Sequence, residues 1–308
     1  MKYIQNRIAE SRIALPCVAV YAAAVWLVAG LVSANWWLQF GCMALSSFLM
    51  MQLNNQNSLI RIYSRMVSCC FLIIVCAGSI LFPSIRASVT TLCFLTFLLL
   101  IFQTYQDKHS VGRTFYAFSM IGLLSLLHVR VLYFVPVFWL LMAFKVQSLS
   151  FRTFLSSVIG LLLPYWLLAP YLVWKGSLSS LMEHFEQLGW VTYPADYDIL
   201  TTGQIAFFCL LVVLAIIGTV HFFRKRYQDK IRTRMLYDVF IIMLWLSLAM
   251  LAVQPQHDLL LFPVAVICVS PLVGHFLALT GTRWTNIAFF VVTALTLLLT
   301  IYNIWMLS

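Results

Sequence analysis

Arg130 is the residue whose position most directly suggests chemistry, because it lies with His128 inside a long apolar run. The run covers residues 114–144, which are 31 residues between Arg113 and Lys145. An arginine deep in a membrane-length apolar segment is costly and marks a functional site by default. Its planar fork of donors matches a phosphate, for example that of a lipid headgroup. The alternative is an anchor whose guanidinium reaches the headgroup level and sets the depth of the segment.

Two aspartates form a second candidate site. Asp196 and Asp198 are separated by one tyrosine, and this D-x-D pattern could hold a divalent metal together with a sugar donor. Tyr193 offers a flat apolar face on which a sugar ring could stack. Three-residue patterns also arise by chance, and tyrosines anchor ordinary loops at membrane interfaces. The sequence therefore leaves metal binding open, and it indicates no other cofactor.

His257 and Asp258 are the third candidate, at the start of a late apolar run. A histidine beside an aspartate could act as a base or carry a proton, although adjacent side chains need not face each other. We expect both on the outer side of the membrane, with a set of polar residues that are candidates for substrate binding. This set comprises His128, Arg130, Lys175, Glu183, Glu186 and Tyr193. The alternative is that these are ordinary loop residues that seek water.

The composition places these residues in a membrane protein. The chain has 308 residues, of which 63% are hydrophobic and 9% are charged, whereas a soluble domain carries about 25% charged residues. In a bilayer only helices and closed barrels satisfy their backbone hydrogen bonds, and the long apolar runs favour helices. We therefore predict an all-α integral membrane protein that forms a single polytopic domain over residues 1–308.

The charges and cysteines exclude other classes of protein. The net charge is +10, but the basic residues lie at the ends of apolar runs, which is typical of orientation signals. No basic stripe with interleaved aromatic residues occurs, so we exclude nucleic acid as a partner. All eight cysteines fall inside apolar runs, where we expect them to pack as small hydrophobic residues.

The apolar runs predict about eleven transmembrane helices. Apart from the run 114–144, the expected spans are 13–31, 35–53, 64–82, 87–103, 153–174, 203–223, 236–254, 258–278 and 285–306. One helix over 114–144 would reach about 46 Å, well beyond a hydrocarbon core of about 30 Å. We therefore expect a short helix hairpin at 114–144 that turns at residues 128–130.

The distribution of charge favours this hairpin and places the N-terminus inside. With the hairpin, only Arg86, Arg130 and Lys175 of the 19 basic residues lie outside. A single helix at 114–144 would instead export the basic loop 224–234, which the positive-inside rule disfavours. We expect that loop to be an orientation signal that also touches anionic headgroups.

Three further expectations concern loops and histidines. The outer loop 175–202 contains apolar residues at helical spacing opposite Glu183 and Glu186, which predicts an amphipathic helix at 177–188 on the outer surface. The polar segment 52–58 is expected to be a turn. Packing roles are expected for three histidines at inner ends of spans, namely His109, His221 and His275.

Two stretches carry a resemblance to a known class of enzymes. The basic outer residue Arg130 precedes the apolar run VLYFVPVFWLLMAF, a basic inner turn and the proline-containing run GLLLPYWLLAPYLVW. Later, the polar outer segment PQHD precedes the run LFPVAVICVSP. In these respects residues 113–175 and 250–278 resemble the GT-C type of multispan glycosyltransferases, which use polyprenyl-phosphate sugars.

The resemblance implies sugar transfer from a polyprenyl phosphate at the outer face of a bacterial inner membrane, for envelope glycan assembly. Arg130 and Lys175 would then hold phosphate, and Asp196 or Asp198 would act as base or metal ligand. Enzymes of this class carry an acidic residue in a large first outer loop, whereas residues 32–36 include no carboxylate. The whole chain also resembles multispan proteins of Bacteroidota envelopes, which implies no activity.

Two other functions stay open. A non-enzymatic scaffold or subunit of an envelope complex would use the outer loop to dock a membrane-protein partner. A flippase or transporter would carry an amphipathic solute, but the spans contain few ionisable residues away from their ends, which disfavours a proton-coupled pump. Membrane lipids are expected partners throughout, and polyprenyl phosphate is the expected partner of the enzyme.

Overall fold

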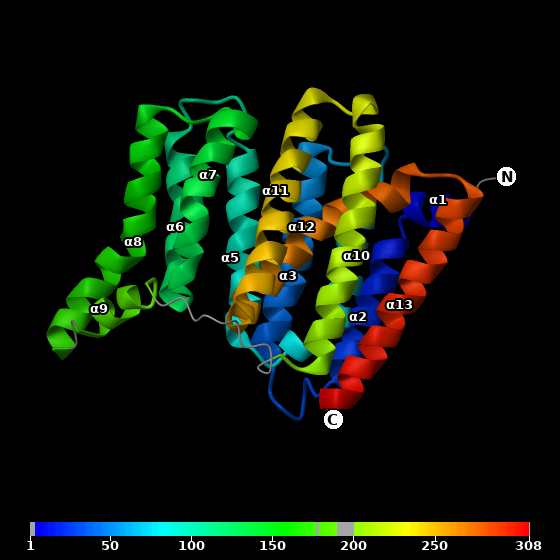
Figure 1. Ribbon diagram of the computed structural model, residues 1–308, viewed down its shortest axis with the longest axis horizontal. Helices are drawn as coiled ribbons and strands as arrows, with labels where there is room; N and C mark the ends of the chain where they lie inside the picture. The colour runs from blue at the N-terminus through cyan, green and yellow to red at the C-terminus, as the bar shows by residue number, and fades with distance from the viewer. Residues whose placement is uncertain (1–3, 177–178, 190–199, 308) are drawn as a thin grey trace. The chain divides into compact units, whose positions relative to one another are not determined.

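The computed structural model describes residues 4–176, 179–189 and 200–307 of the chain. Within these ranges every regular element is a helix, which confirms the predicted helical class (Figure 1). Seven described segments are long and apolar enough to cross a membrane, as expected of a multispan integral membrane protein. They are Ile85–Phe102, Val129–Val146, Phe151–Lys175, Thr202–Gln228, Ile231–Val253, Pro255–Leu279 and Thr285–Met306. The count of about eleven spans stays a prediction.

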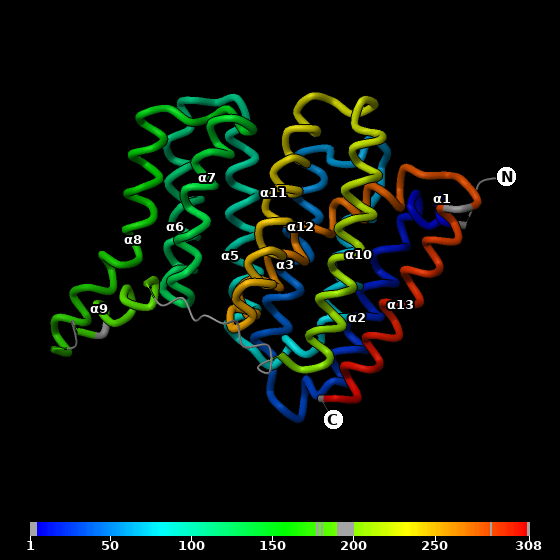
Figure 2. Tube along the Cα trace, viewed as in Figure 1, coloured from blue at the N-terminus to red at the C-terminus, as the bar shows by residue number. Residues whose placement is uncertain are grey.

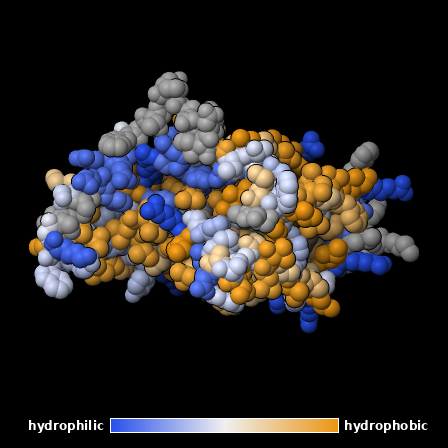
Figure 3. Space-filling model, turned by 90° about the horizontal axis from the view of Figure 1, so that it is seen from below, coloured by the Kyte–Doolittle hydropathy of each residue, from blue (hydrophilic) through white to orange (hydrophobic). Residues whose placement is uncertain are grey.

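Large apolar side chains lie on the outside of several helices. In the helix Phe151–Lys175, for example, Trp166 and Trp174 are 80% and 87% exposed. The face shown in Figure 3 carries wide hydrophobic areas between patches of hydrophilic residues. Soluble monomers rarely expose contiguous apolar surface on this scale. Such a surface is suited to contact with lipid.

The chain forms two compact units, and each is described by itself. Unit 1 comprises Met1–Thr91 and Tyr197–Ser308, and unit 2 comprises Leu92–Asp196. The helices of unit 1 are α1 (Ile4–Glu10), α2 (Ala14–Val28), α3 (Trp37–Asn57), α4 (Met66–Ala77), η1 (Ser79–Leu81), α10 (Thr202–Lys225), η4 (Arg226–Gln228), α11 (Ile231–Val253), η5 (Pro255–His257), α12 (Asp258–Leu279) and α13 (Arg283–Leu307). Helix α5 (Ile85–Phe102) begins in unit 1 and ends in unit 2. The remaining helices of unit 2 are α6 (Val111–Leu127), η2 (Val129–Phe134), α7 (Val135–Leu141), the π-helical turn η3 (Met142–Val146), α8 (Phe151–Lys175) and α9 (Ser179–Glu186).

Helix α12 is the core of unit 1. All of its residues from Leu260 to Ala278 are buried, and it packs against α4, α10 and α11 (Figure 1). A helix that is apolar on every side is expected to be buried on every side. Glycines let the neighbouring helices come close, since a Cβ at Gly274 would lie 3.1 Å from the Cα of Val67 on α4. Small residues at such contacts are typical of helix pairs in membranes.

Unit 2 is built on the pair α6 and α8. A Cβ at Gly122 or at Gly160 would collide with a carbonyl oxygen of the opposite helix, so the two backbones are in close contact. Polar side chains join the pair as well. The hydroxyls of Ser125 and Tyr165 lie 2.7 Å apart, and Ser156 Oγ donates to the carbonyl oxygen of Val111 at 2.7 Å. Each hydroxyl thus has a partner away from lipid.

The segment between α6 and α8 returns to the loop from which α6 begins. Helix α6 ends at Leu127, and the 3₁₀ helix η2 begins two residues later, as Figure 2 shows along the chain. The backbone N–H of Gln106 donates to the carbonyl oxygen of Val146 at 2.9 Å. Ser150 Oγ donates to the carbonyl oxygen of Lys108 at 2.9 Å. These bonds bring the end of η3 and the start of α8 to the loop that precedes α6.

Helix α3 is longer than the sequence predicts. It continues to Asn57, through most of the segment 52–58 that we expected to be a turn. It ends at Ser58, which adopts a left-handed conformation with φ of 48°. Asn54 lies inside this last stretch, and its Nδ2 donates to the carbonyl oxygen of Ser64 at 2.9 Å. The prediction is wrong here because the polar side chain has a partner within the protein and does not need water.

Helix α4 is shorter than the predicted span 64–82, since it ends at Ala77. Gly78 follows, and a Cβ at this position would lie 2.7 Å from Cζ of Phe207. The close approach of this aromatic ring requires glycine, which also weakens the helix. The chain continues as the short 3₁₀ turn η1.

Candidate functional site

Arg130 lies on η2 and binds the end of helix α9. Its Nε donates to the carbonyl oxygen of Gln187 at 3.2 Å, and Tyr133 Oη donates to the carbonyl oxygen of Leu188. Carbonyl groups at a helix C-terminus carry partial negative charge, so a guanidinium is favourable there. His184 adds a third link, because its Nε2 donates to the carbonyl oxygen of Ser125 at 2.9 Å. The end of α9 is thereby held against η2 and the end of α6.

The other predicted residues of unit 2 lie on three elements. His128 follows α6 directly, and Lys175 ends α8, where its Nζ lies 4.8 Å from the ring centroid of Tyr171. Glu183 and Glu186 are exposed on α9. The helix that we predicted at 177–188 is observed at Ser179–Glu186. Tyr193, Asp196 and Asp198 lie outside the described residues, so the proposed sugar and metal site stays a prediction.

Asp258 and His257 lie in unit 1, at the start of α12. Gln204 Nε2 donates to Asp258 Oδ2 at 2.6 Å, and the backbone N–H of Leu259 donates to Oδ1 at 2.7 Å. Gln204 also completes a capping box with Thr201 at the start of α10. The carboxylate of Asp258 therefore joins the first turns of α10 and α12.

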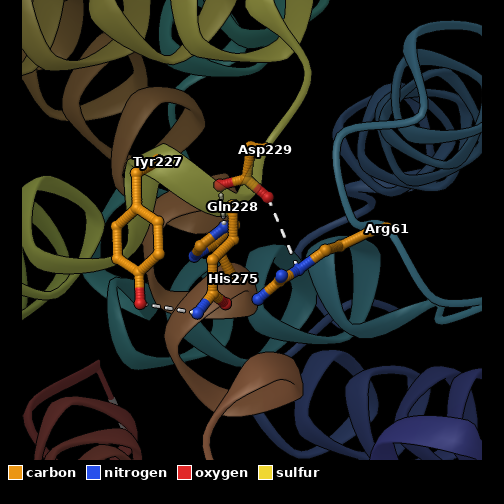
Figure 4. Close-up of polar contacts among 5 residues, drawn as sticks. All are labelled: Arg61, Tyr227, Gln228, Asp229 and His275. Carbon is orange, nitrogen blue, oxygen red and sulfur yellow. Dashed lines mark hydrogen bonds and ion pairs between the residues drawn. The ribbon is translucent and has the colours of Figure 1, made fainter.

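The opposite end of α12 contains a buried charged cluster that the sequence analysis missed. His275 Nε2 donates to Asp229 Oδ2 at 3.1 Å, and Arg61 Nε lies 3.5 Å from Asp229 Oδ1 (Figure 4). The side chains of His275 and Asp229 are 0% and 2% exposed, whereas that of Arg61 is 36% exposed. The cluster thus runs from the core of unit 1 to its surface.

Local sequence explains how each member reaches this place. His275 lies in the last turns of α12, where the ring centroids of Phe222 and Tyr237 are 5.6 and 5.2 Å from its own. Asp229 follows the 3₁₀ turn η4 and precedes α11. Arg61 belongs to the loop between α3 and α4. Because removing a charge from water costs several kcal/mol, these three groups must be brought together as the helices pack.

Two members of the cluster, Arg61 and Asp229, line a polar pocket of about 400 Å³ in unit 1. Its lining comes from the end of α3, the following loop, and the turn before α11. The lining residues are Asn54, Asn55, Ser58, Ile60, Arg61, Ile62, Tyr63, Ser64, Gln228, Asp229, Lys230 and Thr233. This volume is within the range of about 300–1,000 Å³ that ligand pockets occupy.

The charge around this pocket favours an anion. Among the described lining residues Asp229 is the one carboxylate, and it is already paired with His275 and Arg61. Lys230 also lines the pocket. Tyr63 is bound by two more arginines outside the lining: Arg65 Nε donates to its hydroxyl at 3.3 Å, and Arg12 lies 6.0 Å from its ring centroid.

The expectation that His275 only packs at an interface is corrected by these contacts. It is fully buried and hydrogen-bonded to a carboxylate. A signal for the partner was present in the sequence, since Asp229 is the one acidic residue in the basic loop 224–234. A carboxylate kept among so many cations suggests a specific partner, whereas we had assigned the loop to orientation and to contact with anionic headgroups.

No protein-family model matches the chain, and comparisons with curated proteins and with solved structures give no match. Within the described ranges no three His, Cys, Asp or Glu side chains lie close enough to hold a metal ion. The polar pocket is therefore the feature of the described residues that bears on function.

The burial of the cluster predicts unequal effects of two substitutions on stability. His275→Ala leaves the Asp229 carboxylate buried without its nearest donor, which we expect to lower the free energy of unfolding by about 3–5 kcal/mol. Arg61→Ala removes a partly exposed ion pair, which we expect to cost about 0.2–1 kcal/mol. Thermal unfolding of both variants in the same detergent measures the difference. A loss for His275→Ala that is no larger than the loss for Arg61→Ala would contradict the assignment of His275 as the main partner of Asp229.

Proposed function

We propose that the protein is an integral membrane protein that binds a phosphate-bearing ligand in the polar pocket of unit 1. The main support for this proposal is the way in which the guanidinium of Arg61 is bonded. Its Nε faces Asp229, and its two terminal nitrogens have no partner among the described residues. Asp229 therefore orients the guanidinium and leaves a planar pair of donors for a ligand. Such a pair matches two oxygens of a phosphate.

Neighbouring residues supply the other requirements of a phosphate site. Lys230 adds a second cation to the lining, and Ser58, Ser64 and Tyr63 add hydroxyl groups. A buried carboxylate would repel an anion, but both oxygens of Asp229 already face donors. A bound phosphate would therefore contact a lining of net positive charge. In a partly buried pocket the local dielectric constant is low, so charge-assisted hydrogen bonds are strong.

We also propose that this pocket opens on the cytoplasmic side, in a chain of about eleven spans with its N-terminus inside. The basic loops that contain Arg61 and Lys230 meet at one end of unit 1, as the ion pair of Arg61 with Asp229 supports. In unit 2, the bond between Gln106 and Val146 supports the short hairpin at 114–144. The membrane that we propose is a bacterial inner membrane.

A second candidate function is sugar transfer from a polyprenyl phosphate at the outer face, with a non-enzymatic scaffold as its alternative. The contact of Arg130 with the end of α9 supports an outer-face site, because it places an amphipathic helix beside the arginine. Such a helix suits the boundary between headgroups and acyl chains. Asp196 or Asp198 would then be the base or a metal ligand.

Phosphate binding is tested by ligand-dependent stabilisation. A ligand that binds the folded state raises the unfolding temperature, and the rise grows with the logarithm of the ligand concentration relative to Kd. At constant ionic strength, inorganic phosphate should stabilise the native protein more than chloride does. Arg61→Ala removes charged hydrogen bonds worth about 1.5–3 kcal/mol, so phosphate affinity should fall at least about tenfold. The matched control is Arg224→Ala, which removes an exposed arginine that does not line the pocket.

The control should respond to phosphate as the native protein does. If all three proteins respond equally, phosphate does not bind through Arg61 and the proposed function is wrong.

Orientation is tested by labelling introduced cysteines in sealed vesicles. Tyr227 is 68% exposed beside the pocket, and Met182 is 72% exposed on α9. Tyr227→Cys should react with a membrane-impermeant maleimide only from the cytoplasmic side, and Met182→Cys only from the opposite side. The unmodified protein gives the background from its own cysteines. Reaction of both positions from one side would contradict the proposed topology.

Sugar transfer is tested by two polar and two apolar substitutions. An enzyme predicts that Arg130→Ala and Asp198→Asn each abolish transfer to an acceptor while the protein still accumulates in the membrane. A scaffold predicts that both are tolerated, and that Leu181→Ala and Phe185→Ala on α9 weaken partner binding instead. Full activity of Asp198→Asn would remove this residue from the proposed mechanism.

A further inference from the structure

An apolar cavity of about 410 Å³ lies in unit 1 beside the polar pocket. It is bounded by α1, α2, α4, α10, α12 and α13 and the loop between α1 and α2. Its lining is almost entirely apolar and includes Ile13, Cys69, Ile73, Phe289 and Val292. Its lining and volume fit a hydrocarbon chain.

The segment Tyr63–Met66 borders both this cavity and the polar pocket. Tyr63 and Ser64 line the pocket, and Met66 lines the cavity. The backbone N–H of Met66 donates to Ser64 Oγ at 3.2 Å. A residue that lines the cavity is thus hydrogen-bonded to a residue that lines the pocket. A ligand of mixed polarity that occupied both spaces would therefore lie along this segment.

Arg12 marks the same junction from the other side. Its guanidinium lies 6.0 Å from the ring centroid of Tyr63, a residue of the polar pocket. Its neighbours in the chain, Ser11 and Ile13, line the apolar cavity. A cation therefore lies where the two spaces come together, which is where a headgroup would join its hydrocarbon chain.

We propose that the ligand of unit 1 is a lipid phosphate: a phosphomonoester whose headgroup binds Arg61 and Lys230 and whose hydrocarbon chain enters the apolar cavity. This inference rests on the proposed function, because the headgroup site is the same pocket. A free inorganic phosphate would use the polar pocket alone. Only a lipid phosphate would occupy the apolar cavity as well as the polar pocket.

The test fills the cavity without touching the pocket. Val292→Trp places a large ring into the cavity from α13, whereas Leu298→Trp places the same ring on an outward position of α13 that is 64% exposed. The protein is reconstituted in phosphatidylcholine nanodiscs with or without a small fraction of phosphatidic acid. Lipids that remain bound after transfer to neutral detergent are counted by native mass spectrometry. Inorganic phosphate is added to parallel samples, and its stabilising effect is measured.

We expect phosphatidic acid to be retained by the native protein and by Leu298→Trp, in preference to phosphatidylcholine. In Val292→Trp the fraction bound should fall at least about fivefold, as expected for an overpacked site. That variant should still be stabilised by inorganic phosphate, which shows that it is folded and that its pocket is intact. Arg61→Ala should lose both responses.

Two results would overturn the lipid assignment while leaving the proposed function in place. One is equal retention of phosphatidic acid by Val292→Trp and Leu298→Trp, because the chain would then not occupy the cavity. The other is equal retention of phosphatidylcholine and phosphatidic acid by the native protein, because the headgroup would then not be recognised. Undiminished phosphate binding by Arg61→Ala would overturn both proposals.

Discussion

A carboxylate that has lost its water needs a close donor, and the arrangement of unit 1 at one end follows from this requirement at Asp229, whose buried donor is His275. His275 faces one oxygen and Arg61 faces the other. The cost of leaving such a charge unpaired is several kcal/mol, which is more than most single contacts supply. The cluster therefore holds together the loop after α3, the turn before α11 and the last turns of α12. The polar pocket exists because these three segments meet at one carboxylate.

Helix α12 links this cluster to the rest of unit 1. Its interior is apolar and buried, and a carboxylate binds it at each end: Asp258 with Gln204 at the start, and Asp229 with His275 near the end. Asp258 and His275 are separated by about 25 Å along the helix axis, so the two polar contacts lie toward opposite ends of the helix. Packing within a bilayer has little hydrophobic driving force and depends on close contact and on polar pairs. Helix α12 uses both, since Gly274 allows contact with α4 while the carboxylates fix its ends.

The sequence predicts the class of this fold well and its site poorly, for physical reasons. Backbone groups in lipid have few ways to be satisfied, so apolar composition alone predicts helices. The break between α6 and η2 follows from His128 and Arg130, two polar residues that lie at the break itself. The pair Asp229–His275 joins residues 46 apart, and no local pattern indicates which helix faces which loop. Among the outer residues that we predicted, Arg130 and Asp258 have partners that hold helices in place, whereas Asp196 and Asp198 lie outside the described residues.

In our proposal, the cluster at Asp229 builds a headgroup site beside a chain-binding cavity. A cryo-electron microscopy map of the protein in nanodiscs of mixed anionic and zwitterionic phospholipids tests it most directly. We predict that Asp229 and His275 are in contact, and that density for a headgroup at Arg61 continues past Tyr63 as a chain beside Val292. A map in which Asp229 turns away from His275 toward solvent, or in which α13 closes against α4 and leaves no cavity, would contradict the account.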